Sequence, residues 1–320
     1  MIFQKIISFK QILISRGIKS LFIAIVNLLH LFIIRNILKN EFIKKTVNDY
    51  KMILLTNDRG ISRSLILFGS REEDKKFILS SIINDNMNVF DIGSNIGYYS
   101  MFFLRKIKNG KLLAIEPSYE NIELCKKNLK LNGININEVN FINGAASDKN
   151  GKKKFYLSKQ SNLHSLNPEG SAKKFLSGEI RDINTFSIYN LSKTYFKPDL
   201  IRMDVEGHEC EIISGMIKHI KSKLIRPHIC FEPHISSYSN EANFNSILKK
   251  LFNLGYYTNL ISSNAQTGTD RIIKYTGKKP FLIMKSDGEK RAIFKNLKSV
   301  ETVKILTNLG GARTVLLSPR

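Results

Sequence analysis

The chain has 320 residues, of which 42% are hydrophobic and 24% charged, so it can bury a core in one large domain with additions or in two domains. Its 50 basic and 27 acidic residues give a formal net charge of +23, which either attracts nucleic acid, anionic lipid or acidic glycans, or reflects a lysine-rich solvated surface. Three cysteines without a C-x-x-C pair exclude a disulfide framework and fit a reducing cytosol.

Residues 1–48 predict a basic helical extension. Polar residues recur at helical spacing in 1–15, and residues 21–34 form an apolar run interrupted only by Asn27 and His30. Fourteen residues are too few to span a bilayer. Basic residues follow where a signal peptide would have small residues at its cleavage site, so we exclude a signal peptide. Two alternatives stay open: a helix that caps the domain, or one that lies on an anionic membrane surface. We expect a cytoplasmic protein, peripheral to the inner membrane surface in the second case.

Residues 49–86 predict a hairpin followed by a helix. Apolar runs at 52–55 and 64–69 flank the turn-like sequence Asn57-Asp58-Arg59-Gly60, and 71–83 has helical character. This segment leads into a main domain at 87–320.

The sequence NVFDIGSNIG at 88–97 predicts a strand, a tight turn and a helix. Gly93 and Gly97 permit positive φ and close approach of a ligand, but their G-x-x-x-G spacing disfavours NAD. Asp91 could accept hydrogen bonds from an ammonium group or hold the loop through its amides, and the first helical amides could bind an anion. Glu116 ends the next strand, where a ribose diol would meet it. The implied ligand has an amino-acid end and a ribose end.

Strands and helices alternate from 88 to 143, which predicts a parallel sheet with right-handed crossovers. The helices are expected at 95–108 and 118–132, and the strands at 88–92, 111–116 and 139–143. Further strands are expected at 152–157, 199–204, 225–231 and 256–261, with helices at 242–254 and 291–306.

Three ordered blocks carry a family resemblance: DIGSNIGYYS at 91–100, AIEPSYENIELCKKNLKLNG at 114–133 and PDLIRMDVEGHECEIISG at 198–215. Over residues 70–262 the chain resembles the class I S-adenosylmethionine (AdoMet) methyltransferases, and within them the FkbM family. The resemblance implies a three-layer α/β/α Rossmann-like sheet of seven strands, with the last strand at 314–318 inserted antiparallel. It also implies AdoMet as cofactor and O-methylation of a hydroxyl on a sugar, a glycolipid-linked saccharide or a similar small acceptor.

The predicted cofactor contacts follow the ends of the first three strands. They are Asp91, Gly93, Ser94, Asn95, Gly97, Glu116, Pro117, Ala145, Ala146 and Asp148. An alternative for the last three is a small-residue turn that Asp148 caps. The polar segment 158–181 is either a substrate lid, with Asn162, His164 and Ser165 facing the acceptor, or a disordered insertion.

Methyl transfer to a hydroxyl needs an oriented acceptor and a base. We favour Asp204 and His234 as catalytic residues because strand ends fix direction, with Glu206 and His208 as further candidates. His208 has a solvent-facing alternative, and Glu232 is expected to contact substrate. Carboxylates and a histidine could hold a divalent ion, but no pair has diagnostic spacing, so we predict no metal.

Two other functions stay open. The charge allows an RNA or DNA methyltransferase, but D-V-E-G at 204–207 stands where enzymes that methylate base nitrogens carry an N-P-P-Y-like run, so we disfavour nucleic acid. A non-catalytic AdoMet- or nucleotide-binding scaffold is the second alternative. The sequence determines neither the acceptor nor the oligomeric state.

Overall fold

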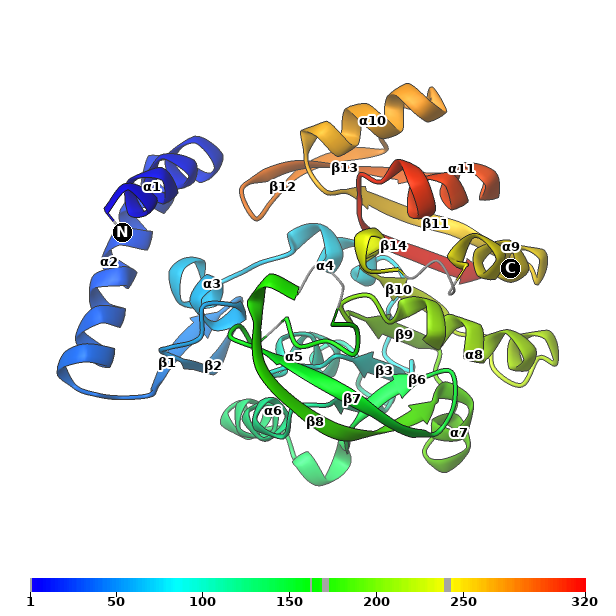
Figure 1. The fold of residues 1–320 in the computed structure, drawn as a ribbon, viewed down its shortest axis with the longest axis horizontal. Coiled ribbons are helices and arrows are strands. Elements are labelled where there is room, and N and C mark those ends of the chain that lie inside the picture. The colour runs from blue at the N-terminus through cyan, green and yellow to red at the C-terminus, as the bar shows by residue number, and fades with distance from the viewer. Residues whose placement is uncertain (1, 162, 169–172, 239–242) are drawn as a thin grey trace.

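A nine-stranded mixed sheet forms the centre of the protein, in a computed structural model that describes residues 2–161, 163–168, 173–238 and 243–320 (Figure 1). The strand order is β12-β13-β11-β14-β10-β9-β3-β4-β5. Strands β5, β4, β3, β9 and β10 are parallel to one another. The bounds are β3 Val89–Ile92, β4 Leu112–Glu116, β5 Asn140–Asn143, β9 Leu200–Met203, β10 His228–Phe231, β11 Tyr256–Ser263, β12 Leu282–Ser286, β13 Glu289–Lys295 and β14 Ala312–Pro319.

The expected seven strands are all present, and the last is inserted as predicted. Strand β14 pairs antiparallel with β10 through Phe231 and Val315, and with β11 through Ile261 and Val315. Strands β12 and β13 extend the sheet beyond β11 and were not predicted. The helix expected at 291–306 is wrong in its first part, because β13 occupies that stretch. Its buried run Ala292, Ile293 and Phe294 belongs to a strand covered on both faces, and α11 is limited to Ser299–Lys304.

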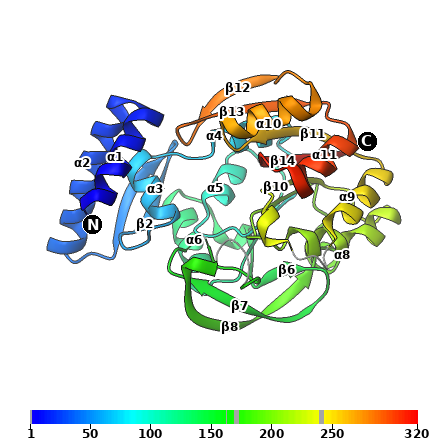
Figure 2. The ribbon, with the colours of Figure 1, turned by 45° about the horizontal axis from the view of Figure 1, so that its top comes forward.

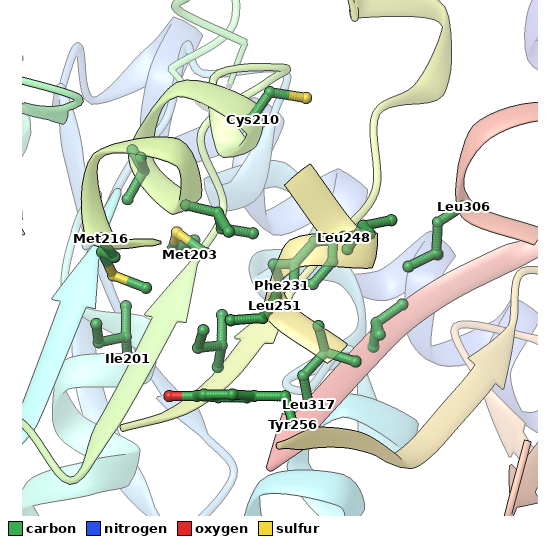
Figure 3. Packing of buried hydrophobic residues seen from close by; sticks show 14 of the residues in the cluster. Ile201, Met203, Cys210, Met216, Phe231, Leu248, Leu251, Tyr256, Leu306 and Leu317 are labelled. Carbon is green, nitrogen blue, oxygen red and sulfur yellow. The ribbon is translucent and has the colours of Figure 1, made fainter. Parts of the chain in front are cut away.

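Helices cover both faces of the sheet, and successive strand residues alternate between two cores. Val89, Leu112 and Leu200 pack in one core with α4 (Glu73–Ser80), α5 (Tyr98–Leu104) and α6 (Tyr119–Leu131). Their neighbours along the strands face the other core, together with α7 (Ile188–Thr194), α8 (Glu209–Lys221), α9 (Phe244–Asn253), α10 (Gln266–Thr276) and α11. Figure 3 shows this second core, where side chains from β9, β10 and β14 meet those of α8 and α9. The period of two is that of a strand buried on both sides.

The N-terminal part differs from the sequence prediction. The hairpin consists of β1 (Phe42–Val47) and β2 (Tyr50–Leu55), whereas residues 64–69 belong to α3 (Ile61–Phe68) and its glycine cap. The Asp58 carboxylate accepts hydrogen bonds from the backbone N–H groups of Gly60 and Ser62, so the turn-like sequence is a helix start. Two helices precede β1: α1 (Ile2–Arg16) and α2 (Ile18–Phe32), which a π-helical turn extends to Ile37. The apolar helix is therefore 20 residues long, enough to cross a membrane by length and composition, which corrects the expectation from the 14-residue run.

A second sheet of three strands, β6 (Ala145–Ser147), β7 (Gly151–Ser158) and β8 (Leu176–Ser187), flanks the central one (Figure 2). Strand β8 pairs antiparallel with β7 and begins inside the segment expected to be a loop at 158–181. The loop prediction is therefore wrong for 176–181. Long strands of polar residues such as β8 lack the apolar alternation by which strands are recognised, and this one is mostly exposed.

Candidate active site

Two adjoining cavities open at the carboxyl ends of β3, β4, β9 and β10. Their walls share Gly93, Asn95, Asp204 and Glu206. The first cavity extends from there toward Glu116 and β6, and the second, of about 290 Å³, extends toward α4 and the start of β14. Ligands of open parallel sheets bind at this edge.

The glycine loop after β3 has the backbone conformation that its sequence predicts. The φ angles of Gly93 and Gly97 are 73° and 88°. A Cβ atom on Gly93 would lie 2.2 Å from the carbonyl oxygen of Asp204, and one on Gly97 would lie 2.7 Å from Cys125 Sγ. Gly93 lines both cavities, but Gly97 lines neither, so the expected ligand contact at Gly97 is corrected to a packing contact with α6.

Ser94 faces the second cavity with an unpaired hydroxyl. Its side chain is 2% exposed, and its Oγ is buried with no hydrogen-bond partner among the described residues. Buried polar atoms normally have partners, so an orphaned hydroxyl in a cavity wall indicates a polar group of a ligand.

Asp91 does not line either cavity, which corrects the prediction that it binds the ligand directly. Its fully buried carboxylate accepts hydrogen bonds from Ser100 Oγ at 2.7 Å and from Arg202 Nη1 at 3.2 Å. Arg202 in turn donates to the Gly93 carbonyl at 3.0 Å and to Asp204 Oδ2 at 2.8 Å. Asp91 therefore orients Arg202, and Arg202 ties the glycine loop to the end of β9.

Glu116 lies in the wall of the first cavity, as predicted for a carboxylate near a ribose. Its two oxygens accept hydrogen bonds at 2.9 Å from the backbone N–H groups of Asn95 and Ser118. Burial raises the pKa of Glu116 to about 7, although these hydrogen bonds oppose the shift. Each oxygen keeps a further lone pair, so the carboxylate can accept hydrogen bonds from hydroxyl groups of a ligand. Pro117 lines the same cavity beside it.

Small residues form the far wall of the first cavity. Gly144, Ala145 and Ala146 line it together with Phe155 from β7. Asp148, also expected there, does not line it: its carboxylate accepts a hydrogen bond from Ser147 Oγ at 2.9 Å. The sequence could not show that β6 ends at Ser147 and that Asp148 lies outside the wall of the first cavity.

His208 belongs to the first cavity, which contradicts its solvent-facing alternative and leaves its catalytic role a prediction. Its side chain is 6% exposed rather than solvent-facing, and its Nε2 lies 3.0 Å from Ser147 Oγ. Burial, with Lys153 nearby, lowers the pKa of His208 to about 3. The imidazole is therefore neutral and lies beside the small-residue wall, away from the second cavity.

His164 and Ser165, which were expected to face the acceptor, line the first cavity. His164 Nδ1 accepts a hydrogen bond from the Ser158 N–H at 2.8 Å, and Ser165 Oγ donates to the carbonyl of Glu206 at 3.2 Å. Asn162 lies outside the described residues. The described part of 158–181 thus covers the cavity that contains Glu116.

Buried ion pairs build the second cavity. Lys75 Nζ lies 3.1 Å from Glu72 Oε2, 3.2 Å from Asp204 Oδ2 and 3.1 Å from Glu232 Oε2. Arg313, at the start of β14, contacts Glu232 and Glu72. Lys75 and Arg313 were not predicted, because α4 and β14 are remote in sequence from the glycine loop. Arg202 could have been found from the sequence, since it is a charged residue within an apolar strand.

These ion pairs keep Asp204 ionised, which limits its ability to act as a base. Although burial opposes the charged form, Lys75 and Arg202 hold the pKa of Asp204 below its usual range. A carboxylate so stabilised is a poor proton acceptor. Asp204 is therefore corrected from a preferred base to an ionised anchor of the cavity wall, and Glu232 is an ion-pair partner of Lys75 and Arg313.

Glu206 and His234 meet where the two cavities join. His234 Nδ1 lies 2.8 Å from Glu209 Oε1, and its Nε2 lies 3.5 Å from Glu206 Oε2. Burial opposes the charge on His234, but the carboxylates of Glu209, Glu206 and Glu232 raise its pKa to about 10. Burial raises the pKa of Glu206 to about 8. Glu206 also has a φ of 50°, uncommon for a residue with a side chain and frequent at functional sites.

A divalent ion could be held by these groups. One ligand atom each from Asp204, Glu206 and His234 lies within 4.8 Å of the others. Asp204 Oδ2, however, already accepts from Lys75 and Arg202, and these cations supply the charge that a metal would bring. Absence of a metal stays a prediction.

Residues 91–257, more than half of the chain, match the family described as Methyltransferase FkbM domain. The chain belongs to the FkbM methyltransferase family. A protein from Jannaschia sp. (strain CCS1) with a provisional methyltransferase name is 29% identical over 123 residues, which cover 36% of this chain and 43% of that protein.

Two solved structures match parts of this chain. Methyltransferase FkbM from Methylobacillus flagellatus KT is 16% identical with a TM-score of 0.41, covering 62% of this chain and 48% of that one. TYW2 from M. jannaschii in complex with AdoMet is 12% identical with a TM-score of 0.36, covering 88% of both chains. This FkbM-family chain thus spans less than half of the Jannaschia relative and of the M. flagellatus structure.

Proposed function

We propose that the protein is an AdoMet-dependent O-methyltransferase that modifies a hydroxyl of a polyhydroxylated acceptor, such as a sugar or a glycolipid-linked saccharide. One observation carries the proposal: the two cavities share the walls Gly93, Asn95, Asp204 and Glu206. A nucleotide in one cavity and an acceptor in the other would therefore meet beside Glu206 and His234.

The first cavity and the loop beside it suit AdoMet. The Glu116 carboxylate would accept hydrogen bonds from the ribose hydroxyls, and the small residues 144–146 leave room for the adenine ring. The methionine part would extend along the shared wall of Gly93 and Asn95 to the edge of the second cavity, where the orphaned Ser94 hydroxyl would donate to its carboxylate. When bound, AdoMet would supply the electrophilic methyl group.

The second cavity suits a polyol. Its walls carry both donors and acceptors, with Arg71, Arg313 and Glu72 around the space and Tyr98 on one side. These groups are fixed by ion pairs, so they are oriented before an acceptor binds. Preorganised polar groups orient hydroxyls at little entropic cost.

Glu206 would take the proton of the acceptor hydroxyl. A carboxyl group whose pKa is raised to about 8 is a stronger base than an ordinary glutamate and is still partly ionised near neutral pH. The protonated imidazole of His234, held by Glu209, stabilises the ionised form of Glu206. Asp204, Lys75 and Arg202 keep the wall in place without exchanging protons.

A transfer assay with labelled AdoMet tests the proposal against its alternatives. The protein is incubated with nucleotide-sugar, oligosaccharide, glycolipid and RNA acceptors, and AdoMet binding is measured by calorimetry. Methyl transfer to a glycan hydroxyl supports the proposal. Transfer to RNA with steeply salt-dependent binding would favour the nucleic-acid enzyme. AdoMet binding without turnover on any acceptor, unchanged by Asp204→Asn, would favour the scaffold, and a failure to bind AdoMet would overturn both enzyme functions.

A further inference from the structure

The helix formed by α2 and its π-helical extension exposes an apolar face away from the domain. Of the 18-residue window in Ile18–Ile37 that is apolar enough to cross a membrane, 11% is buried. Ile18, Phe22, Leu29 and Ile37 are each more than 60% exposed. Soluble proteins rarely present so continuous an apolar surface unless something covers it. We name this surface, with its members Ile18, Phe22, Val26, Leu29, Ile33 and Ile37, the α2 face.

The opposite side of the same helix is attached to the domain along its length. Ala24 and Leu31 are buried, and between them Asn27 donates from Nδ2 to the carbonyl of Leu67 at 3.0 Å. Its Oδ1 accepts from Lys45 Nζ at 2.7 Å. The polar residue in the middle of the apolar run therefore binds α3 and β1, and the α2 face stays free of it. To cross a bilayer the helix would have to break these contacts, whereas lying on its surface keeps them.

Charge indicates what covers the α2 face. The first acidic residue of the chain is Glu41, whereas six basic residues precede it. Lys19 at one end of the helix and Arg35 and Lys39 at the other are exposed. A second copy of the chain packed on this face would bring only basic ends together, in parallel or antiparallel orientation. Anionic lipid headgroups instead neutralise both ends while acyl chains cover the apolar side chains between them.

We propose that the α2 face binds the surface of an anionic bilayer, with the helix parallel to the membrane plane and the domain attached behind it. This inference does not depend on methyl transfer. It assigns the lipid surface as the partner of the N-terminal helices. The proposal concerns attachment from one side and not a membrane-spanning helix.

Vesicle flotation of the full chain tests the proposal. Wild-type protein is expected to float with phosphatidylcholine/phosphatidylglycerol vesicles and to bind phosphatidylcholine vesicles more weakly. The double variant Phe22→Ser/Leu29→Ser is expected to lose about tenfold or more in partition, because each side chain contributes apolar burial. The control Phe281→Ser/Ile283→Ser alters exposed apolar residues just before and within β12, outside the α2 face, and is expected to float like wild type. Circular dichroism and AdoMet calorimetry check that all variants fold.

Three outcomes of the flotation and sedimentation experiments would overturn the proposal. The wild-type protein fails to float with anionic vesicles, or the Phe22→Ser/Leu29→Ser variant floats as well as the control. Alternatively, sedimentation shows a wild-type dimer that this variant dissolves, without vesicle binding. Orientation is tested with Ser20→Cys and Asn40→Cys on sealed vesicles: an impermeant maleimide is expected to label both positions from outside. Protection of one position only would show a spanning helix and overturn surface attachment.

Discussion

The imidazole of His234 lies between two glutamates: its Nδ1 is 2.8 Å from Glu209 Oε1 and its Nε2 is 3.5 Å from Glu206 Oε2. A carboxylate can only accept, so Nδ1 donates to Glu209. This contact fixes the ring and directs the second nitrogen toward the residue that lines both cavities. The order Glu209, His234, Glu206 leads from the start of α8 to the point where an acceptor would react.

Glu206→Gln is expected to lower kcat by about 10²-fold or more, because it removes the group that takes the acceptor proton. AdoMet affinity should stay within about twofold of wild type. Steady-state kinetics and calorimetry measure both quantities. Glu211→Gln, on the same part of the chain but outside both cavities, serves as a matched control. Wild-type kcat in Glu206→Gln would refute the assignment of the base.

The pH profile of kcat/KM is expected to be bell-shaped. Activity rises as Glu206, with a pKa of about 8, loses its proton, and it falls as His234, with a pKa of about 10, loses its charge. Because the two groups interact, the limbs belong to the pair. His234→Gln removes the stabilising cation, so the rising limb should move to higher pH. A rising limb that stays in place in His234→Gln would contradict this coupling.

AdoMet binding is expected to weaken as pH falls below about 7. Glu116 has a raised pKa of about 7, and only its ionised form accepts hydrogen bonds with both oxygens. Glu116→Gln should weaken binding by about tenfold or more and abolish this pH dependence, as measured by calorimetry from pH 5.5 to 8.5. Glu123→Gln on α6 is the control. Binding by Glu116→Gln that keeps the wild-type pH dependence would rule out this role.

The raised pKa of Glu116 also affects the stability of the ligand-free protein. The folded pKa of Glu116 lies above its ordinary value near 4.5, so its favourable contribution to folding is complete below about pH 4.5 and is lost as pH rises through about 7. Urea unfolding at pH 5.5 and 8 should therefore show a smaller loss of stability in Glu116→Gln than in wild type. An equal loss in both proteins would show that other groups dominate.

Lys75→Met is expected to lower the free energy of unfolding by about 3–5 kcal/mol, because it leaves the carboxylates of Glu72, Asp204 and Glu232 without their shared buried cation. Lys76→Met, one residue further on α4, loses a hydrogen bond to Asn48 and should cost about 1 kcal/mol or less. Urea unfolding compares the two. Similar losses would show that the cluster does not depend on Lys75.

The sequence predicted the elements with strong local signals. The apolar strands β3, β4, β9, β10 and β14, the glycine loop and Glu116 all lie where expected, because buried strands read as apolar runs and glycines mark positive φ. The sequence could not show that the Asp91 carboxylate faces Arg202 and not the ligand, because a carboxylate lies at the end of β3 in either arrangement.

Contacts between segments that are distant in the sequence also could not be predicted from local sequence patterns. Lys75 forms an ion pair with Glu232, although most of the central domain separates the two residues in the sequence. No pattern near either residue in the sequence indicates its partner. Strands β12 and β13 were missed because each contains only three consecutive apolar residues, 282–284 and 292–294, and the turn at Asp287-Gly288 joins them at the edge of the sheet. The sequence could not show which cavity His164 and Ser165 line, because the pairing of Tyr156 with Ser165 places their segment beside Glu116.

The position of β14 has a consequence for biosynthesis. This strand fills the slot between β10 and β11, and it carries Arg313 into the charged wall beside Glu232. While residues 312–319 are still inside the ribosome, the nascent sheet has a gap between β10 and β11, and the second cavity lacks the side that Arg313 forms. The N-terminal helices emerge long before that moment, so binding of lipid through the α2 face, as proposed, would precede completion of the second cavity.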